Sequence, residues 1–274
     1  MRSCIAIRIE TGKIMLTVQK ENEKFESSSI LEGMTSISAV INGCRENDRR
    51  ILRVLVDESR RRQKHAEIGF LTAKSHELGF ELTFVPAEEI EALTIGSSHG
   101  GIVAVCTDRA IPTLTEGMIR ENGFYVYLEG IEDPYNFGYT LRSLYAAGVD
   151  GVVLPPRNWM SAAGVVARAS AGASELLPLY TADVDTLVNA FKGAGYTLLC
   201  AGIRDSVSIF EAELRYPLLL VVGGEKRGIS RALLDRADQI VRIDYGREFR
   251  GSLSAASAAT VMAFEIFRQN KNRA

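Results

Sequence analysis

"DPYNFGYTLRSLYAAGVDGVVLPP", residues 133–156, is the stretch that decides the fold of this 274-residue chain. The preceding "YVYLEGI" is typical of a strand, "YTLRSLYAAG" of a helix that ends at Gly148, and "GVVLPP" of a second buried strand. Together they predict a βαβ unit. Open α/β sheets bind ligands at the carboxyl ends of their strands, so Asn136, Gly138 and Arg142 lie where chemistry is expected. A tight turn and a helix-surface arginine would explain the same residues without any function.

The composition is that of a soluble globular protein, with 46% hydrophobic and 24% charged residues, and the length suffices for two domains. No apolar run is long enough to span a bilayer, and the N-terminus carries charges where a signal peptide needs an apolar core. We therefore expect a cytoplasmic protein without a membrane partner. Cys4, Cys44, Cys106 and Cys200 lack C-x-x-C spacing, which favours inert thiols over a disulfide framework or a zinc site, and no metal is expected.

A basic stretch stands out in a chain whose net charge is −2. Residues 45–64 hold seven Arg and one Lys against two Asp and two Glu. Such a patch is typical either of solvated loop ends around a strand or of a phosphate-binding surface, on which each Lys or Arg releases a counterion. The second interpretation predicts RNA contacts from four residues: Arg60, Arg61, Arg62 and Lys64.

The first part of the chain alternates between helical and strand patterns, which predicts a small α/β domain. We expect helices over 32–42, 64–79 and 87–94 and strands over 51–57, 80–86 and 100–106. A hairpin turned at Thr11-Gly12-Lys13 precedes this domain, and Pro112 and Gly117 interrupt the pattern after it. The predicted organisation is therefore an N-terminal extension, a first domain, a linker and a second domain, with bounds 1–29, 30–108, 109–121 and 122–274.

The α/β alternation resumes after the linker. We expect strands over 124–130, 151–154, 196–203, 218–224 and 239–244, and helices over 137–147, 161–171, 183–193 and 230–236. A last long helix begins near Leu253 and is rich in Ala and Ser. Small residues let another backbone approach closely, which suits a partner subunit or a tightly folded loop, although Ala is also the best helix former.

Two further motifs follow the first in the same domain. In "LLLVVGGEKRGIS", residues 218–230, an apolar strand ends at Gly223-Gly224 and Ser230 is the expected N-cap of the next helix. In "VRIDYGREFRGSLSAASA", residues 241–258, a basic loop precedes Ser252 at the start of the last helix. Neither is a dinucleotide or P-loop fingerprint. Singly, they are explained by a tight turn, a solvated basic loop and Ser252 as an N-cap serine.

Taken together, the three motifs resemble the SpoU or TrmH-type RNA ribose methyltransferases of the SPOUT superfamily, from about Gly33 to the C-terminus. The resemblance rests on N-x-G-x-x-x-R at 136–142, G-x-E-x-x-G-I-S at 223–230 and S-L-x at 252–254. "RASAGASELLPLY", "EGMTSISAVIN" and "HGGIVAV" are similar to further segments of that family. Three ordered motifs with a matching accessory domain are far more specific than any one of them.

The resemblance implies a small α/β substrate-binding domain followed by a parallel-sheet domain with a deep trefoil knot. It also implies a homodimer that transfers a methyl group from S-adenosylmethionine (AdoMet) to a ribose 2′-hydroxyl of ribosomal or transfer RNA. The cofactor positions of the family fall on Gly223, Gly224, Ile243 and Leu253. The catalytic and RNA-handling positions fall on Asn136, Arg142, Glu225, Ser252 and Ser254, with Arg247 and Arg250 as further RNA contacts.

The implied reaction needs alignment of oxygen, carbon and sulfur and removal of a hydroxyl proton, without a metal. Arginine is an awkward base, so we assign Arg142 to a bidentate contact with the target phosphate. Asn136 would orient the hydroxyl or Arg142, and Glu225 would pair with an arginine. The three histidines, His65, His76 and His99, all precede this domain and are interpreted as structural or surface residues.

The chain departs from the family in the third motif. Ser254 replaces an asparagine, and serine lacks the reach and second donor of the amide. Asp244 and Tyr245 replace a proline and a methionine, and the loop is about one residue longer. An alternative is therefore an RNA-binding relative that keeps the fold but has lost methyl transfer. A Rossmann-type oxidoreductase would need a glycine-rich phosphate turn and an acidic ribose ligand, which the sequence lacks.

Overall fold

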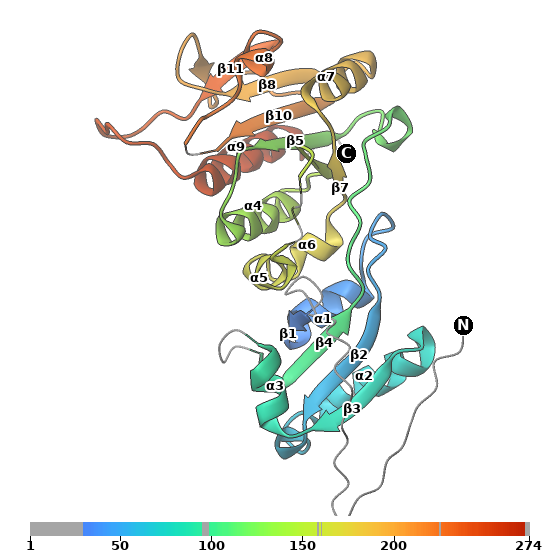
Figure 1. Cartoon of the computed structure of the whole chain (residues 1–274). Coiled ribbons are helices and arrows are strands. Elements are labelled where there is room, and N and C mark those ends of the chain that lie inside the picture. The colour runs from blue at the N-terminus through green and yellow to red at the C-terminus, as the bar shows by residue number, and fades with distance from the viewer. Residues whose placement is uncertain (1–29, 95–98, 158, 160, 225, 272–274) are drawn as a thin grey trace, which may run out of the picture.

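The computed structural model of the chain describes residues 30–94, 99–157, 159, 161–224 and 226–271 (Figure 1). The predicted N-terminal hairpin, Cys4 and Glu225 lie outside these residues. The described chain forms two α/β units of different size, each with its own sheet, which are joined by a linker and packed against each other (Figure 1).

The N-terminal part is a four-stranded sheet with helices on both faces. Its strand order is β1-β4-β2-β3, in which only the β2–β3 pair is parallel. Apolar residues of α1 and α2 pack on one face and those of α3 on the other. The elements are β1 (Ile30–Glu32), α1 (Gly33–Ile41), β2 (Ile51–Asp57), a 3-10 turn (Glu58–Arg60), α2 (His65–Leu78), β3 (Glu81–Val85), α3 (Ala87–Leu93) and β4 (Ile102–Cys106).

The C-terminal part is built on a parallel sheet of seven strands in the order β7-β6-β5-β10-β8-β11-β9. This confirms the α/β class and the parallel sheet predicted from the sequence; the trefoil knot stays a prediction. The strands are β5 (Phe124–Glu129), β6 (Gly151–Leu154), β7 (Leu179–Thr181), β8 (Thr197–Ala201), β9 (Val207–Ser208), β10 (Leu218–Gly223) and β11 (Gln239–Arg242).

Helices cover both faces of this sheet, as a parallel sheet requires (Figure 1). Successive residues of β5 point to opposite faces: Phe124 packs with α4, α5 and α9, whereas Tyr125 packs with α7 and α8. The helices are α4 (Pro134–Ala146), α5 (Ala163–Ala169), α6 (Ala173–Leu176), α7 (Val184–Gly193), α8 (Arg231–Leu234) and α9 (Ala255–Asn270), and a 3-10 turn (Glu116–Met118) lies in the linker.

Two sequence predictions about helix ends are wrong. The helix expected from residue 137 begins at Pro134, because proline suits the first helical position and the Asp133 side chain accepts a hydrogen bond from the Asn136 N–H. The cap of α9 is Ser254, whose hydroxyl accepts from the Ser257 N–H, and not Ser252. Ser230 holds the N-cap position of α8 as predicted, but its side chain makes no capping bond.

The alanine-rich face of α9 packs inside its own chain. Ala255, Ala259 and Ala263 are buried in the core that α9 shares with α4 and β10. Small residues here permit close approach of α4, so their enrichment gives no support to a partner subunit at that face. The outer side of α9 instead exposes Phe264 and Phe267, whose rings pack edge to face.

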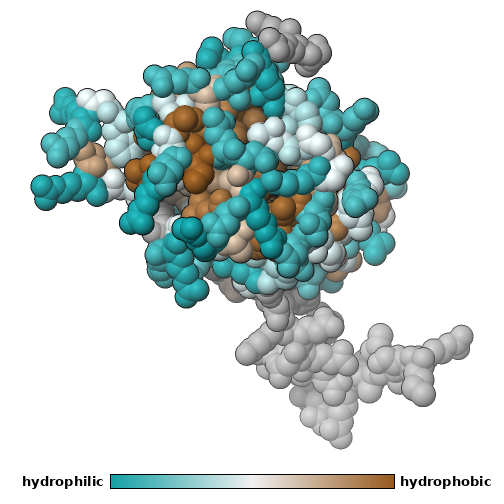
Figure 2. Space-filling view, turned by 90° about the horizontal axis from the view of Figure 1, so that it is seen from above, coloured by the Kyte–Doolittle hydropathy of each residue, from teal (hydrophilic) through white to brown (hydrophobic). Residues whose placement is uncertain are grey.

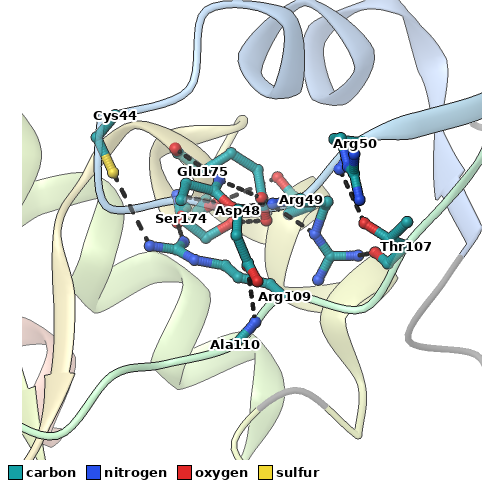
Figure 3. Close-up of polar contacts among 12 residues, drawn as sticks. Cys44, Asp48, Arg49, Arg50, Thr107, Arg109, Ala110, Ser174 and Glu175 are labelled. Atoms are coloured by element: carbon teal, nitrogen blue, oxygen red, sulfur yellow. Dashed lines mark hydrogen bonds and ion pairs between the residues drawn. The ribbon is translucent and has the colours of Figure 1, made fainter.

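A buried polar network joins the two sheets (Figure 3). The Arg49 guanidinium lies 3.2 Å from the carboxylate of Glu175 in α6, and both side chains are sealed from solvent. Asn47 donates to the same carboxylate over 2.8 Å, and Arg109 donates to the carbonyl oxygens of Ser174 and Leu177. The network fixes the N-terminal sheet to α6 through contacts distant in sequence.

Among the described residues, no helix is both long and apolar enough to cross a membrane.

Candidate functional site

The three sequence motifs meet at a small cavity. It lies beyond the carboxyl ends of β5 and β10, beside the first residues of α4 and α9, and has a volume of about 130 Å³. Gly130 follows β5, Asn136 is in the first turn of α4, Lys226 follows β10 and Ala255 begins α9, and all four line the cavity. The fold therefore brings segments about 120 residues apart to one place at the predicted edge of the sheet.

The glycines of the second motif are required by close backbone contacts. A Cβ atom at Gly224 would overlap the carbonyl group of Gly130, and one at Gly223 would overlap the backbone of Gly228. Any larger residue would push the loop after β10 away from the loop after β5. What β10 presents at its end is consequently backbone rather than side chain.

Asn136 and Gly138 have different tasks in α4. Asn136 lines the cavity, and its carbonyl oxygen accepts a hydrogen bond from the Thr140 hydroxyl over 2.7 Å. Gly138 is buried, and a Cβ atom there would overlap Ala169. The absent side chain lets α4 and α5 cross closely, so Gly138 positions the helix and does not face the site.

Arg142 lies away from the cavity of its own chain. It lies six positions after Asn136, which turns it roughly 240° around the helix axis. Its side chain is exposed and is not among the residues that line the cavity. Within the described part of one chain, Arg142 and Asn136 are therefore not brought together.

The loop between β11 and α9 forms a projecting arm, residues 244–253, seen on the left of Figures 1 and 2. Figure 2 shows this arm as mainly hydrophilic, and Arg247, Arg250 and Ser252 are all exposed. Inside the arm the Tyr245 hydroxyl accepts a hydrogen bond from the Leu253 N–H over 3.1 Å. This hydrogen bond joins the two ends of the arm. It involves Leu253, a residue that the family resemblance assigns to the cofactor.

The remaining predicted cofactor residues differ in accessibility. Ile243 is half-buried and packs against the main core, Gly223 is half-buried, and Gly224 is buried. The Ser254 hydroxyl donates a hydrogen bond to the Ser257 hydroxyl over 3.0 Å in addition to capping α9. The serine in place of the family's asparagine therefore has a defined role at the helix end.

Sequence reasoning missed several polar residues around the second motif. The Glu129 carboxylate at the end of β5 accepts a hydrogen bond from the Ser230 N–H over 2.7 Å, and the Ser230 hydroxyl is buried without a partner among the described residues. Lys226 forms an ion pair with Glu132 over 2.7 Å, and the Lys226 ammonium lowers the pKa of that carboxyl. Glu129 could have been predicted as a site residue, because it is an acidic residue at the carboxyl end of a buried strand.

The basic stretch of the N-terminal domain divides into exposed and buried residues. Arg60 pairs with Asp57, the Arg61 guanidinium lies over the Phe84 ring, and Lys64 pairs with Glu67. Arg60, Arg61 and Arg62 are exposed, so they stay available for the predicted phosphate contacts. Arg49, in the same stretch but not one of the four predicted contacts, is buried in the junction with α6.

The described thiols and histidines differ in their exposure. Cys106 and Cys200 are buried, and burial raises the pKa of each thiol to about 12. Burial also raises the pKa of the Cys44 thiol. His65 and His76 are exposed, whereas His99 is buried. No group of three potential metal ligands occurs among the residues that the structure describes.

Two solved methyltransferase structures share this fold. An AdoMet-bound rRNA methyltransferase from Sinorhizobium meliloti is 22% identical, with a TM-score of 0.73 over 87% of this chain and 86% of that one. The SpoU methyltransferase AviRb from Streptomyces viridochromogenes, in complex with AdoMet, is 23% identical, with a TM-score of 0.72 over 91% of this chain and 98% of that one. At this level of identity the likeness defines the class of fold.

Sequence comparison defines the family. Residues 123–264 match the SpoU rRNA methylase family, and residues 30–112 match the domain described as RNA 2′-O ribose methyltransferase substrate binding. The chain belongs to the SpoU rRNA methylase family. A relative in Staphylococcus saprophyticus, named as a TrmH-family tRNA/rRNA methyltransferase, is 29% identical over 68% of this chain and 76% of its own length. A Staphylococcus aureus relative with the same name is 27% identical over 80% of this chain and 89% of its own length.

Proposed function

We propose that this protein transfers a methyl group from AdoMet to a ribose 2′-hydroxyl of structured RNA, ribosomal or transfer, in the cytoplasm. The observation that carries the proposal is the convergence of the three motifs on one cavity at the ends of β5 and β10. Family membership and the names of its relatives support the same reaction. The division into a substrate-binding domain (30–108), a linker (109–121) and a methyltransferase domain (122–274) is part of the proposal.

The residues present fit AdoMet in part. The backbone surface left by Gly223 and Gly224 suits a ligand held mainly through main-chain groups. The cavity of about 130 Å³ is smaller than the 300 Å³ or more of most small-molecule sites, so it would hold only the reacting end of the cofactor. Ile243 and Leu253, on either side of the arm, would hold the rest. Bound AdoMet would supply an electrophilic methyl group.

The side chains around the cavity then act by positioning. Asn136 would orient the ribose hydroxyl, and Arg142 would hold the phosphate of the target nucleotide through a bidentate contact. Glu225, Ser252 and Ser254 complete the proposed catalytic set, with Arg60, Arg61, Arg62, Lys64, Arg247 and Arg250 as RNA contacts.

A homodimer is part of this proposal, because Arg142 does not reach the cavity of its own chain. A second copy that packs against α4 would bring Arg142 to the neighbouring cavity. Tyr139, which is 50% exposed on α4, and the exposed Phe264 of α9 are apolar surface for such a contact. Light scattering should give twice the 30.0 kDa chain mass; a stable monomer at micromolar concentration contradicts the shared site.

The start of α9 is compatible with an active enzyme. Asparagine and serine are both strong N-cap residues, and Ser254 makes the capping bond that its position requires. The substitution therefore preserves the helix end that follows the arm. Ser254→Asn should accordingly leave the methyl-transfer rate similar or higher.

Transfer of label from AdoMet to total cellular RNA, followed by identification of the labelled nucleotide, tests the function. Arg142→Ala should abolish transfer and leave AdoMet affinity near wild type. Arg215→Ala is the matched control, because Arg215 is an exposed arginine before β10, at the opposite end of the sheet. If the wild type labels no RNA and Ser254→Asn restores labelling, the protein is an RNA-binding relative instead.

A further inference from the structure

A second cavity lies between the N-terminal sheet and α5, apart from the candidate active site. Its volume is about 250 Å³. The first turn of α1 (Gly33–Ser36) forms one side, and Lys64, His99, Arg168 and Ala171 close the others. The walls thus come from both domains: α1, α2 and the segment before β4 on one side, and α5 with its following turn on the other.

The first turn of α1 presents hydrogen-bond donors to this cavity. The first four N–H groups of a helix have no intrahelical partner, and the N-cap residue, Glu32, makes no side-chain capping bond. The helix is nine residues long, so its dipole adds a partial positive charge at the same end. Both features favour an anionic ligand.

Two buried side chains add independent evidence. Ser36 is 2% exposed, and its hydroxyl makes no hydrogen bond among the described residues. Ser36 lines the cavity, and its hydroxyl is not among the fully sealed polar atoms of the described residues. His99 is 9% exposed, and its Nδ1 accepts the Gly101 N–H over 3.1 Å, which places the proton of the neutral ring on Nε2. Nε2 has no partner in the described chain and is a further donor for the cavity.

The charges around the cavity favour an acceptor-rich ligand. Lys64 lies 2.8 Å from Glu67, and Arg168 lies 2.8 Å from Glu32, whose carboxylate is the one acidic group among the described residues that line the cavity. Arg168 offsets that carboxylate. Beside this offset pair the described lining holds the Lys64 ammonium, an imidazole N–H, a hydroxyl and the helix N–H groups, so donors outnumber acceptors.

The backbone beside the cavity is held in a strained conformation. Ala171 has a φ of 50°, a left-handed value that is uncommon for residues other than glycine. It is followed by Gly172, where a Cβ atom would overlap Ala39 of α1. The turn after α5 is therefore pressed against α1, which fixes the distance between the two walls. A strained backbone conformation of this kind persists only where the surrounding packing enforces it, and such conformations are frequent at functional sites.

We propose that this second cavity, at the junction of the two domains, binds a phosphate group. In the functioning protein this phosphate belongs to the RNA strand. The proposal rests on the proposed RNA substrate and adds the place at which both domains hold the strand together. A free phosphate or nucleotide carries the same chemistry, so the test separates the two sources.

Side-chain ¹⁵N NMR of the histidines provides the readout, since the chain has three histidines and only His99 lines the cavity. Titration with a short single-stranded oligoribonucleotide should shift the His99 Nε2 signal and leave His76 unchanged, whereas His65 follows the proposed RNA contact Lys64 and is not a control. Inorganic phosphate should produce the same shift at much higher concentration. A response to phosphate without one to RNA overturns the RNA assignment, and silence in both titrations overturns the site.

Matched lysine variants add a second measurement. Lys64 and Lys74 both lie on or beside α2 and both pair with a glutamate three residues later, but only Lys64 lines the cavity. Lys64→Gln should weaken oligonucleotide binding about three- to tenfold and lower the salt slope by about 0.7, whereas Lys74→Gln should change neither. Ser36→Ala should weaken binding without altering the salt slope. Equal effects of the two lysine variants contradict the proposal.

The outcome is separable from that of the proposed function. Methyl transfer without a His99 response leaves the function intact and removes the phosphate site. A His99 response to RNA without methyl transfer leaves the phosphate site and supports the RNA-binding relative.

Discussion

Replacing Glu175 by Gln removes a fully buried carboxylate from the network that joins α6 to the N-terminal sheet (Figure 3). The carboxylate is 1% exposed, lies 3.2 Å from the Arg49 guanidinium and accepts a hydrogen bond from Asn47. At that distance and an effective dielectric constant of about 20, the Coulomb energy of the pair is about 5 kcal/mol. Burial lowers the pKa of the neighbouring Arg109 and the negative charge of Glu175 opposes that lowering, so a second guanidinium is stabilised by the same carboxylate.

Breaking one side of a buried pair leaves an uncompensated charge and costs about 3–5 kcal/mol. For a chain of this size we expect a melting temperature lower by roughly 6–20 °C. Glu81→Gln is the matched control, because Glu81 pairs with Arg53 over 3.0 Å on the exposed surface of the same sheet. Such a pair contributes about 0–1 kcal/mol. Calorimetry of both variants that gives equal melting temperatures would refute the reasoning and assign the junction to apolar contacts alone.

Three other outcomes follow from local geometry. Tyr245→Phe frees the Leu253 N–H and should tighten AdoMet binding by about two- to tenfold in calorimetry, and weaker binding would contradict the proposed role of the arm. Cys106 and Cys200, with thiol pKa values of about 12, should resist iodoacetamide at pH 8 until the protein unfolds, because almost no thiolate is present; rapid labelling of the folded protein would contradict this. Gly224→Ala should lower the melting temperature and abolish methyl transfer, since the added methyl group would overlap backbone atoms, and a wild-type melting curve would contradict that packing.

Much of the fold is readable from the sequence, because long apolar strands and helix caps are local signals. The strands expected at 51–57 and 151–154 have those bounds in the structure. The very short strands β1, β7 and β9 were missed, since two or three residues carry no periodicity and are extended only because a neighbouring strand pairs with them.

The location of Asn136 was predictable from the sequence, but the geometry of the candidate site was not. Asn136 was placed correctly at the end of the sheet because the strand–helix order alone determines it. The separation of Arg142 from the cavity depends on where α4 begins, and the start at Pro134 was misjudged. The Arg49–Glu175 pair joins residues 126 positions apart, and no local pattern in the sequence indicates such a contact.

One segment, residues 168–175, serves both the junction and the proposed phosphate site. Arg168 and Ala171 line the cavity, while Ser174 and Glu175 anchor the segment to the N-terminal sheet. The walls of this cavity come from two domains, so its affinity for a ligand depends on how firmly the two domains are held at a fixed distance and orientation. Glu175→Gln should therefore weaken the oligonucleotide response of His99, even though it changes no cavity-lining atom.

The control for this coupling is again Glu81→Gln, which alters an ion pair on the same domain far from α5 and α6. Both variants are compared by NMR at a temperature at least 10 °C below the lower melting point, so that only folded protein contributes. We expect a raised dissociation constant for Glu175→Gln and a wild-type value for Glu81→Gln. If Glu175→Gln lowers the melting temperature and binds RNA as wild type does, the buried pair stabilises the fold without positioning the phosphate site, and the cavity walls are held by the close packing of Gly172 against α1.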